Sequence, residues 1–227
     1  MPQLTSEDLL RIVVLAAVLL GVAFPVHEFC HAWMANRLGD STARYMGRLS
    51  LNPVRHFDPW GGGILLLTLL LSGGTFAIGA AKPTPVNPTN LRGGRRGEMW
   101  VALAGPASNL VLAALAAIPI RIIVAVPGLA DQILRNDVAS LGLSILFYFL
   151  QINIVLFIFN LIPVPPLDGW TVLRGLVNPR TAWEMTRLQG QIGIYGMLVV
   201  FMLFLFAGNL VLAPIIEGLT RLLTGLG

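Results

Sequence analysis

The chain has 227 residues, of which 56% are hydrophobic and only 11% are charged, and its mean hydropathy is +0.77. Soluble domains carry about 25% charged residues, so this composition excludes a soluble globular protein and a disordered chain. The formal net charge of +4 arises from 15 basic and 11 acidic side chains, too few for a basic face that binds nucleic acid, and the single cysteine excludes an internal disulfide.

Long runs without charged residues indicate the fold class. Apart from Glu28, no charged residue occurs in residues 12–36, 59–81, 99–120, 138–167 or 188–216. A helix of about 20 apolar residues crosses a bilayer. The sequence therefore predicts an all-α polytopic membrane protein, a single domain over residues 1–227, with about four transmembrane helices. The predicted spans are 10–36, 98–126, 138–164 and 190–215.

The basic residues predict the orientation of these spans, because Lys and Arg favour the cytoplasmic side. Residues 37–58 and 82–98 each hold four basic side chains, and residues 168–187 hold three. We therefore expect these three segments inside, and both termini and residues 121–137 outside.

Residues 59–81 need a different assignment, since both flanking segments are expected inside. Only residues 64–71 are dense in aliphatic side chains, and glycines flank them. We expect a re-entrant or interfacial element here, with short strands at 48–51 and 75–80. Irregular backbone at membrane depth is tolerated where protein or water covers it. An ordinary glycine-rich span with a weak charge bias is the alternative.

The first span carries the motif His27-Glu28-Phe29-Cys30-His31, of the form HExxH. At 100° per residue, His27 and His31 lie about 40° apart on a helix, one turn from each other. Two imidazoles at this spacing can bind one zinc ion, and the adjacent glutamate can activate its water. A carboxylate within a membrane span is costly and marks a functional site by default. The alternative is a bundle core in which these side chains only hydrogen-bond to one another.

A catalytic zinc site needs a third protein ligand and an open position. The third long uncharged run ends in the segment NLIPVPPLDG (160–169), in which prolines break the helix before Asp168. Asp168 belongs to an inner-side loop near the depth of HExxH, and we expect it to fold back as the third ligand; a helix-ending Asp-Gly turn is the alternative. Cys30 points about 100° away from His31, which favours packing. His56 could bind a metal or receive substrate, but a role in stabilising a turn or contacting a lipid headgroup is favoured.

Together these motifs resemble the site-2 protease family of intramembrane zinc metalloproteases. The similar loops are those of its compact microbial branch, which lacks the PDZ or CBS domains of its relatives. The resemblance covers residues 10–190. It rests on HEFCH (27–31), LNPVRHFDP (51–59), KPTPVNP (82–88), AGPASN (104–109) and NLIPVPPLDG (160–169).

By this resemblance, His27, His31 and Asp168 bind one zinc ion per chain, and Glu28 is the general base. The implied activity is an endopeptidase that hydrolyses peptide bonds within or next to transmembrane segments. A membrane-protein substrate and the lipid bilayer are the expected partners, with no nucleic acid. The chain is expected in the cell membrane as a multi-pass protein, with its active site near the cytoplasmic side.

Two asparagines are candidate substrate-binding residues. The resemblance implies that Asn160 contacts the substrate backbone or the developing oxyanion. Asn109 is expected to support a ligand or a substrate strand, with a hydrogen bond between helices as the alternative. Two departures from the family pattern, Thr84 and Trp170, are not expected to touch a zinc ligand.

The sequence leaves two other functions open. A metal or proton transporter could use the same intramembrane His, Glu and Asp side chains, although no duplicated half is visible. A catalytically inactive relative could bind membrane segments without cutting them, although the intact Glu28 argues against it.

Overall fold

The computed structural model describes residues 5–75, 77–192, 195–196 and 208–226, and the regular structure in these residues is helical. Even the shortest of three long apolar helices extends over ~36 Å, more than the ~30 Å hydrocarbon core of a bilayer. These helices confirm the all-α membrane fold and match three predicted spans, whereas half of the fourth, 190–215, lies outside the described residues. The long helices are Ser6–Arg37 (32 residues), Arg95–Ala125 (31) and Asp137–Asn160 (24).

The first long helix changes its winding just before the HExxH motif. The amide of Phe24 bonds the carbonyl of Leu19, five residues back, so a π-turn is inserted. Pro25 lacks an amide hydrogen, and the wider turn is compatible with the missing bond. The helix therefore continues past Pro25 and carries His27 and His31. Its pieces are α1 (Ser6–Val18), η1 (Leu19–Ala23) and α2 (Phe24–Arg37).

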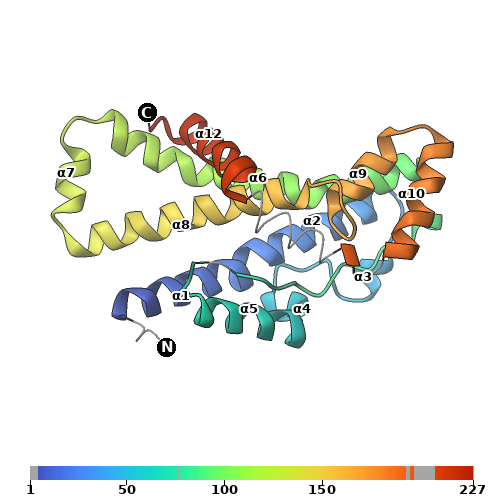
Figure 1. Cartoon of the computed structure of the whole chain (residues 1–227), viewed down its shortest axis with the longest axis horizontal. Helices are drawn as coiled ribbons and strands as arrows, with labels where there is room; N and C mark the ends of the chain where they lie inside the picture. Colours follow the sequence, from blue (N-terminus) through green and yellow to red (C-terminus); the bar gives the residue numbers. More distant parts are fainter. Residues whose placement is uncertain (1–4, 76, 193–194, 197–207, 227) are drawn as a thin grey trace.

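Helix α5 (Pro59–Leu71) lies alongside α1 (Figure 1). Its side chains Leu65 and Leu69 are fully buried, in a cluster with Ile12 of α1. The 13 residues of α5 extend over only ~20 Å, too short to cross the hydrocarbon core. Two shorter helices precede it, α3 (Thr42–Tyr45) and α4 (Pro53–His56).

The chain then returns along α5 with residues 77–87 free of helix, and we call residues 77–90 the strap (Figure 1). Near its start, the hydroxyl of Thr68 accepts a hydrogen bond from the amide of Ile78 and donates to its carbonyl. Further on, the amide of Lys82 donates to the carbonyl of His56. The two ends of the segment around α5 therefore meet, as the expected re-entrant element requires. The strap ends in η2 (Pro88–Asn90).

The strands expected at 48–51 and 75–80 are absent from the described residues, and this prediction is wrong. The strap bonds to a side chain of α5 and to the end of α4 instead of pairing with a strand. Gly61 permits this close contact, because a Cβ there would lie 2.2 Å from the carbonyl oxygen of Ala80.

A helical hairpin forms the second half of the described bundle. Three alanines of its first helix pack against Leu150 and Ile154 of the second. Small side chains at such an interface let membrane helices approach closely. The C-terminal helix covers the same pair. These elements are α6 (Arg95–Ala125), α7 (Leu129–Leu134), α8 (Asp137–Asn160), η3 (Gly208–Leu212) and α12 (Ala213–Thr224).

After α8 the chain reverses and packs α9 (Asp168–Leu176) against α6. Gly169 makes the reversal possible, because a Cβ there would lie 2.2 Å from the carbonyl oxygen of Leu161. Gly175 likewise lets α9 approach α6, since its Cβ would lie 2.4 Å from the Cβ of Met99. The sequence thus places glycine at two close contacts of α9.

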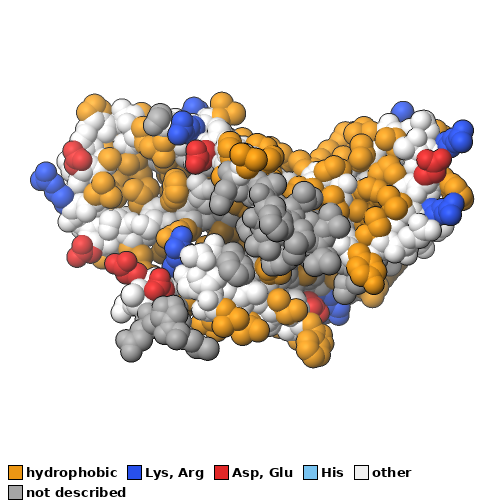
Figure 2. Space-filling model, viewed as in Figure 1, with side chains coloured by type: hydrophobic (Ala, Val, Ile, Leu, Met, Phe, Trp, Pro, Cys, Tyr) orange, Lys and Arg blue, Asp and Glu red, His pale blue; other side chains and the backbone are white. Residues whose placement is uncertain are grey.

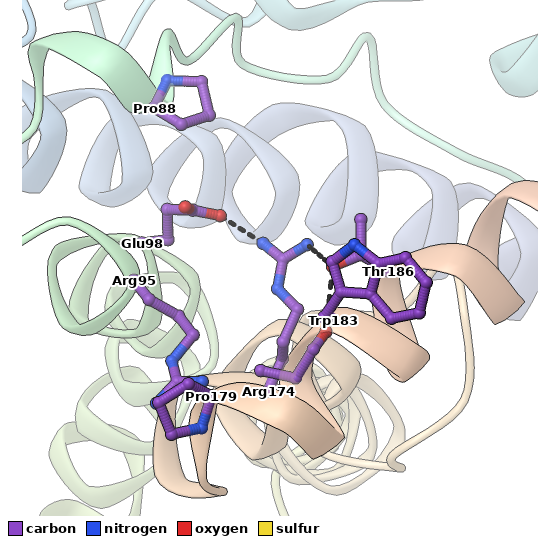
Figure 3. Close-up of a pocket in the computed structure, with 8 residues that line it drawn as sticks. Pro88, Arg95, Glu98, Arg174, Pro179, Trp183 and Thr186 are labelled. Carbon is purple, nitrogen blue, oxygen red and sulfur yellow. Dashed lines mark hydrogen bonds and ion pairs between the residues drawn. The ribbon is translucent and has the colours of Figure 1, made fainter.

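An ion pair joins the same two helices on the side that faces α10 (Pro179–Ile192). Arg174 of α9 reaches from Glu98 of α6 to the Thr186 hydroxyl of α10 (Figure 3). Both charged side chains are largely buried, so α9 is held on α6 by charge as well as by packing.

Hydrophobic side chains cover much of the face shown in Figure 2, and charged side chains gather at its two ends, near α9 and α10 at one end and near α7 and the start of α1 at the other. Large apolar residues are exposed on the long helices. On helices that can span a bilayer, an apolar surface of this kind fits contact with lipid. Examples are Val13, Val111, Leu115, Ile118 and Leu141.

We predict that the segments before and after α5 lie on one side of the membrane, because His56 and Lys82 are hydrogen-bonded neighbours. Tyr45 and Thr89 are exposed, one in each segment. Single cysteines at these positions, in a Cys30→Ser background, should react with an impermeant thiol reagent from the same face of membrane vesicles. Labelling from opposite faces would show that α5 belongs to a span.

Candidate metal centre

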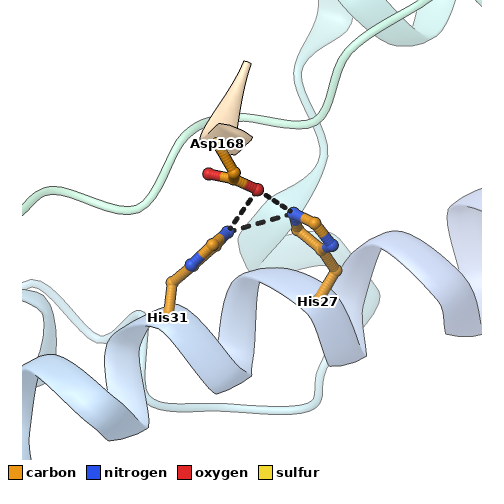
Figure 4. Close-up of side chains that lie close together, drawn as sticks. All are labelled: His27, His31 and Asp168. Atoms are coloured by element: carbon orange, nitrogen blue, oxygen red, sulfur yellow. Dashed lines mark hydrogen bonds and ion pairs between the residues drawn. The ribbon is translucent and has the colours of Figure 1, made fainter. Parts of the chain in front are cut away.

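Three ligand atoms from distant parts of the chain converge on one point (Figure 4). The Nε2 atoms of His27 and His31 are 3.0 Å apart. Oδ2 of Asp168 lies 3.2 Å from the first and 3.3 Å from the second. The histidines stand one turn apart on α2, and Asp168 is the first residue of α9. The structure thus brings together the three residues expected to bind zinc.

The second nitrogen of each imidazole is held by an oxygen that can only accept a hydrogen bond. Nδ1 of His27 lies 2.6 Å from Oδ1 of Asn109, and Nδ1 of His31 lies 2.7 Å from the carbonyl oxygen of Val101. Both Nδ1 atoms therefore carry a proton and act as donors. In neutral rings this leaves an unprotonated Nε2 directed at the point of convergence.

This arrangement fits a cation better than it fits a hydrogen-bonded core. Two nitrogen lone pairs and a carboxylate oxygen face one another, and Oδ2 of Asp168 accepts no hydrogen bond from the described residues. In a tetrahedral site with zinc–nitrogen distances of about 2.0–2.1 Å, neighbouring ligand atoms are about 3.3–3.4 Å apart. The observed separations are close to that value, so the three side chains fit a zinc ion.

Gly105 of α6 leaves room for the ion. A Cβ at this position would lie 2.3 Å from Nε2 of His31 and 2.7 Å from Nε2 of His27. A side chain there would occupy the space beside both ligand atoms. The AGPASN segment thus leaves space for the ion at Gly105 and, one turn later, supplies the amide of Asn109 that supports His27.

Glu28 lies outside the group of three, and the strap holds its carboxylate. The amide of Thr84 donates to Oε2 of Glu28 over 2.8 Å, and the Thr84 hydroxyl donates to the Glu28 carbonyl over 3.0 Å. One carboxylate oxygen is therefore fixed by backbone. In the sequence, Thr84 stands out only as a departure from the family pattern, and nothing in the sequence predicts its contact with Glu28.

The far end of the strap is fastened to Asp40, just beyond α2. This carboxylate is fully buried and accepts hydrogen bonds from the amide of Asn87, the side-chain amide of Asn90 and both donors of Thr42. Burial by itself raises the pKa of Asp40, but these donors outweigh it and hold the pKa below the ordinary value of 3.8. Asp40 thus remains ionised and anchors the strap.

The other candidate residues lie apart from the three ligand atoms. The Asn109 side chain is fully buried against His27, where it supports a ligand. Asn160 is partly buried at the end of α8 and donates to the carbonyl of Leu156. His56 is buried with Nε2 2.6 Å from the Ser50 carbonyl oxygen, as expected for a turn. Cys30 is a partly buried free thiol outside the ligand group.

Comparison with known proteins identifies relatives over most of the chain. A family model for peptidase family M50 matches residues 120–205. "Putative zinc metalloprotease YwhC" of Bacillus subtilis is 37% identical over 202 residues, which are 88% of this chain and 84% of the relative. "Putative zinc metalloprotease Rip2" of Mycolicibacterium smegmatis is 34% identical over 171 residues, 75% of this chain and 59% of the relative. The chain therefore spans only part of Rip2. No solved structure matches the chain significantly.

We predict that Gly105→Ala abolishes zinc binding, because the added methyl group would enter the space between the two Nε2 atoms. Zinc content of the purified protein measures the effect. Gly142→Ala on α8 is the matched control, since a Cβ there meets no atom within 4 Å. Zinc retained in Gly105→Ala would show that the ion does not bind beside α6.

We predict that Asp40→Asn destabilises the protein at neutral pH by about 2 kcal/mol, a typical contribution of hydrogen bonds to a charged group. The pKa of Asp40 is lowered on folding, so its contribution is present above about pH 4 and is lost as the pH falls through the lower folded pKa. Thermal unfolding of both proteins between pH 7 and about pH 3 should show the difference shrinking with acidity. A constant difference would contradict the assignment.

Proposed function

The chain belongs to peptidase family M50, and we propose that His27, His31 and Asp168 hold a zinc ion with which it hydrolyses peptide bonds within or next to transmembrane segments of other proteins. The chain is a zinc metalloprotease of the membrane. The substrate class, the ligand set with one zinc ion per chain and the chemical roles below are our proposal.

One observation carries the proposal: two unprotonated imidazole nitrogens and a carboxylate oxygen converge beside a glycine, and the imidazoles and the glycine lie on helices long enough to span a bilayer. Three protein ligands with space left beside them are typical of a catalytic zinc site, whereas structural sites are closed by a fourth protein ligand. The transporter alternative has no comparable support, because the matching family and relatives are named for peptidases.

The protein side chains divide the chemistry between them. Zinc at this centre would polarise the scissile carbonyl and make the attacking water more acidic. Glu28 accepts the proton of that water and delivers it to the leaving nitrogen. The Thr84 amide occupies Oε2, so Oε1 is the oxygen we assign to the water. Asn160, at the end of α8, donates to the substrate backbone.

The strap is the surface that we propose for the unwound substrate. The amides of Ile78, Lys82 and Thr84, which are separated by even numbers of residues, are bonded to the protein. In an extended backbone the intervening residues turn their polar groups to the opposite edge, where Gly79 and Ala81 offer amides and carbonyls and Pro83 and Pro85 offer carbonyls only. A substrate strand added to that edge would exchange main-chain hydrogen bonds without requiring a particular side chain.

The proposed setting is a cell membrane, with the metal centre near the cytoplasmic side. The ligands lie at the end of the bundle from which the basic segments 37–58, 82–98 and 168–187 extend, and positive charge favours that side. A membrane protein with a transmembrane segment and the surrounding lipid are the proposed partners.

We predict that Glu28→Gln lowers cleavage of a model transmembrane peptide by roughly 10²–10⁴-fold while zinc stays bound. Gln is nearly isosteric and can still accept from the Thr84 amide, but it cannot take up a proton at neutral pH. Asp168→Ala should instead weaken zinc binding, because Asp168 is a proposed ligand.

Zinc content and peptide cleavage are measured side by side in the wild type and both variants. Full cleavage in Glu28→Gln would refute the proposed general base. Full zinc occupancy in Asp168→Ala would remove Asp168 from the ligand set.

A further inference from the structure

A chain of hydrogen bonds continues from His27 into the neighbouring helices. Asn109 of α6 accepts from Nδ1 of His27 through Oδ1, and its Nδ2 donates to Oδ1 of Asn153 over 2.9 Å. Nδ2 of Asn153 donates in turn to the carbonyl oxygen of Phe149 over 2.8 Å. Both asparagine side chains are fully buried. The chain therefore joins α2, α6 and α8 at the level of the metal centre.

The last bond determines the direction of the others. A backbone carbonyl can only accept, so the group of Asn153 that faces Phe149 must be its amide nitrogen, and the oxygen of Asn153 faces Asn109. Asn109 must then turn its nitrogen to Asn153 and its oxygen to His27. With an oxygen at Nδ1, the proton of His27 stays on Nδ1 and Nε2 remains free for the metal.

We propose that Asn153 is a positioning residue of the metal centre, which acts through Asn109 to hold His27 in the tautomer and orientation that bind zinc. The inference rests on the proposed zinc site and adds a residue two contacts away from the ion. Without Asn153, the amide of Asn109 could rotate and present its nitrogen to His27, because nothing would distinguish its two ends. An NH group facing Nδ1 would favour the other tautomer and block Nε2.

Breaking this series of hydrogen bonds is costly because both asparagine side chains are buried. An unpaired polar group in an apolar interior loses free energy comparable to a hydrogen bond, so Asn109 cannot be left half satisfied without cost. Partners behind a histidine ligand typically change metal affinity by roughly 10–100-fold when they are removed. We expect substitution of Asn153 to change zinc affinity by this amount, even though Asn153 does not touch a ligand atom.

The test measures zinc affinity of the full chain in lipid nanodiscs by competition with a chelator. Asn153→Leu removes both hydrogen-bonding ends at similar volume and should weaken zinc binding by roughly 10–100-fold. Asn153→Asp should restore it, because a buried neutral carboxyl group can accept from Asn109 and donate to Phe149.

Asn160→Leu is the matched control. Asn160 stands seven residues later on the same helix, and its amide makes the same bond to the carbonyl four residues back, with Leu156 as partner. It has no hydrogen bond to Asn109 among the described contacts. Its substitution should leave zinc affinity unchanged, which separates the role of Asn153 from a general effect of losing an asparagine on α8.

A double variant tests the route through Asn109. If Asn153 acts through it, Asn109→Leu combined with Asn153→Leu should bind zinc no more weakly than Asn109→Leu alone. Wild-type affinity in Asn153→Leu, an equal loss in Asn160→Leu, no recovery in Asn153→Asp, or fold-losses that multiply in the double variant would each overturn the proposal. Absence of zinc binding in the wild type would instead overturn the proposed function.

Discussion

Three atoms that carry lone pairs are held within 3.3 Å of one another in the interior of a largely apolar bundle, and much of the fold follows from that constraint. In such surroundings every polar group needs a partner. The imidazoles are satisfied on their outer sides by an amide oxygen and a backbone carbonyl, which leaves their inner nitrogens for a cation. Gly105 lies beside them, because the methyl group of an alanine would occupy the space that the ion needs.

The motif-based part of this centre could be predicted from the sequence. The spacing of His27 and His31 defines one face of a helix, and the proline-rich turn before Asp168 predicts a chain reversal. The family resemblance supplied the same three ligands. The contributions of Gly105, Val101 and Asn153 could not be predicted in this way, because each depends on which residue of another helix lies opposite. The residue type alone does not show that Gly105 leaves space for an ion or that the Val101 carbonyl accepts a hydrogen bond.

The segment around α5 shows a different limit of sequence reasoning. Its charges predict that both flanks lie on one side of the membrane, and the hydrogen bond between Lys82 and His56 is compatible with that prediction. The expectation of strands at 48–51 and 75–80 failed because an extended backbone has other partners available. Here the hydroxyl of Thr68 and the carbonyl of His56 take the place of a neighbouring strand. The strap is thereby bound to helices at one edge and to the Glu28 carboxylate further on.

The π-turn at η1 has a consequence for how this chain can change over evolution. Such a turn adds one residue to the helix, and one residue corresponds to a rotation of about 100°. The stripe formed by His27, His31 and Ala35 is buried after the turn, while Ile12 and Val18 face the core before it. Loss of a single residue from η1 would restore regular winding and swing both histidines away from Asn109 and Val101. The exposed positions of η1, Gly21 and Val22, have room for other apolar side chains, whereas the number of residues in η1 is fixed by the position of the histidines, so we expect insertions and deletions there to be more damaging than substitutions at these two positions.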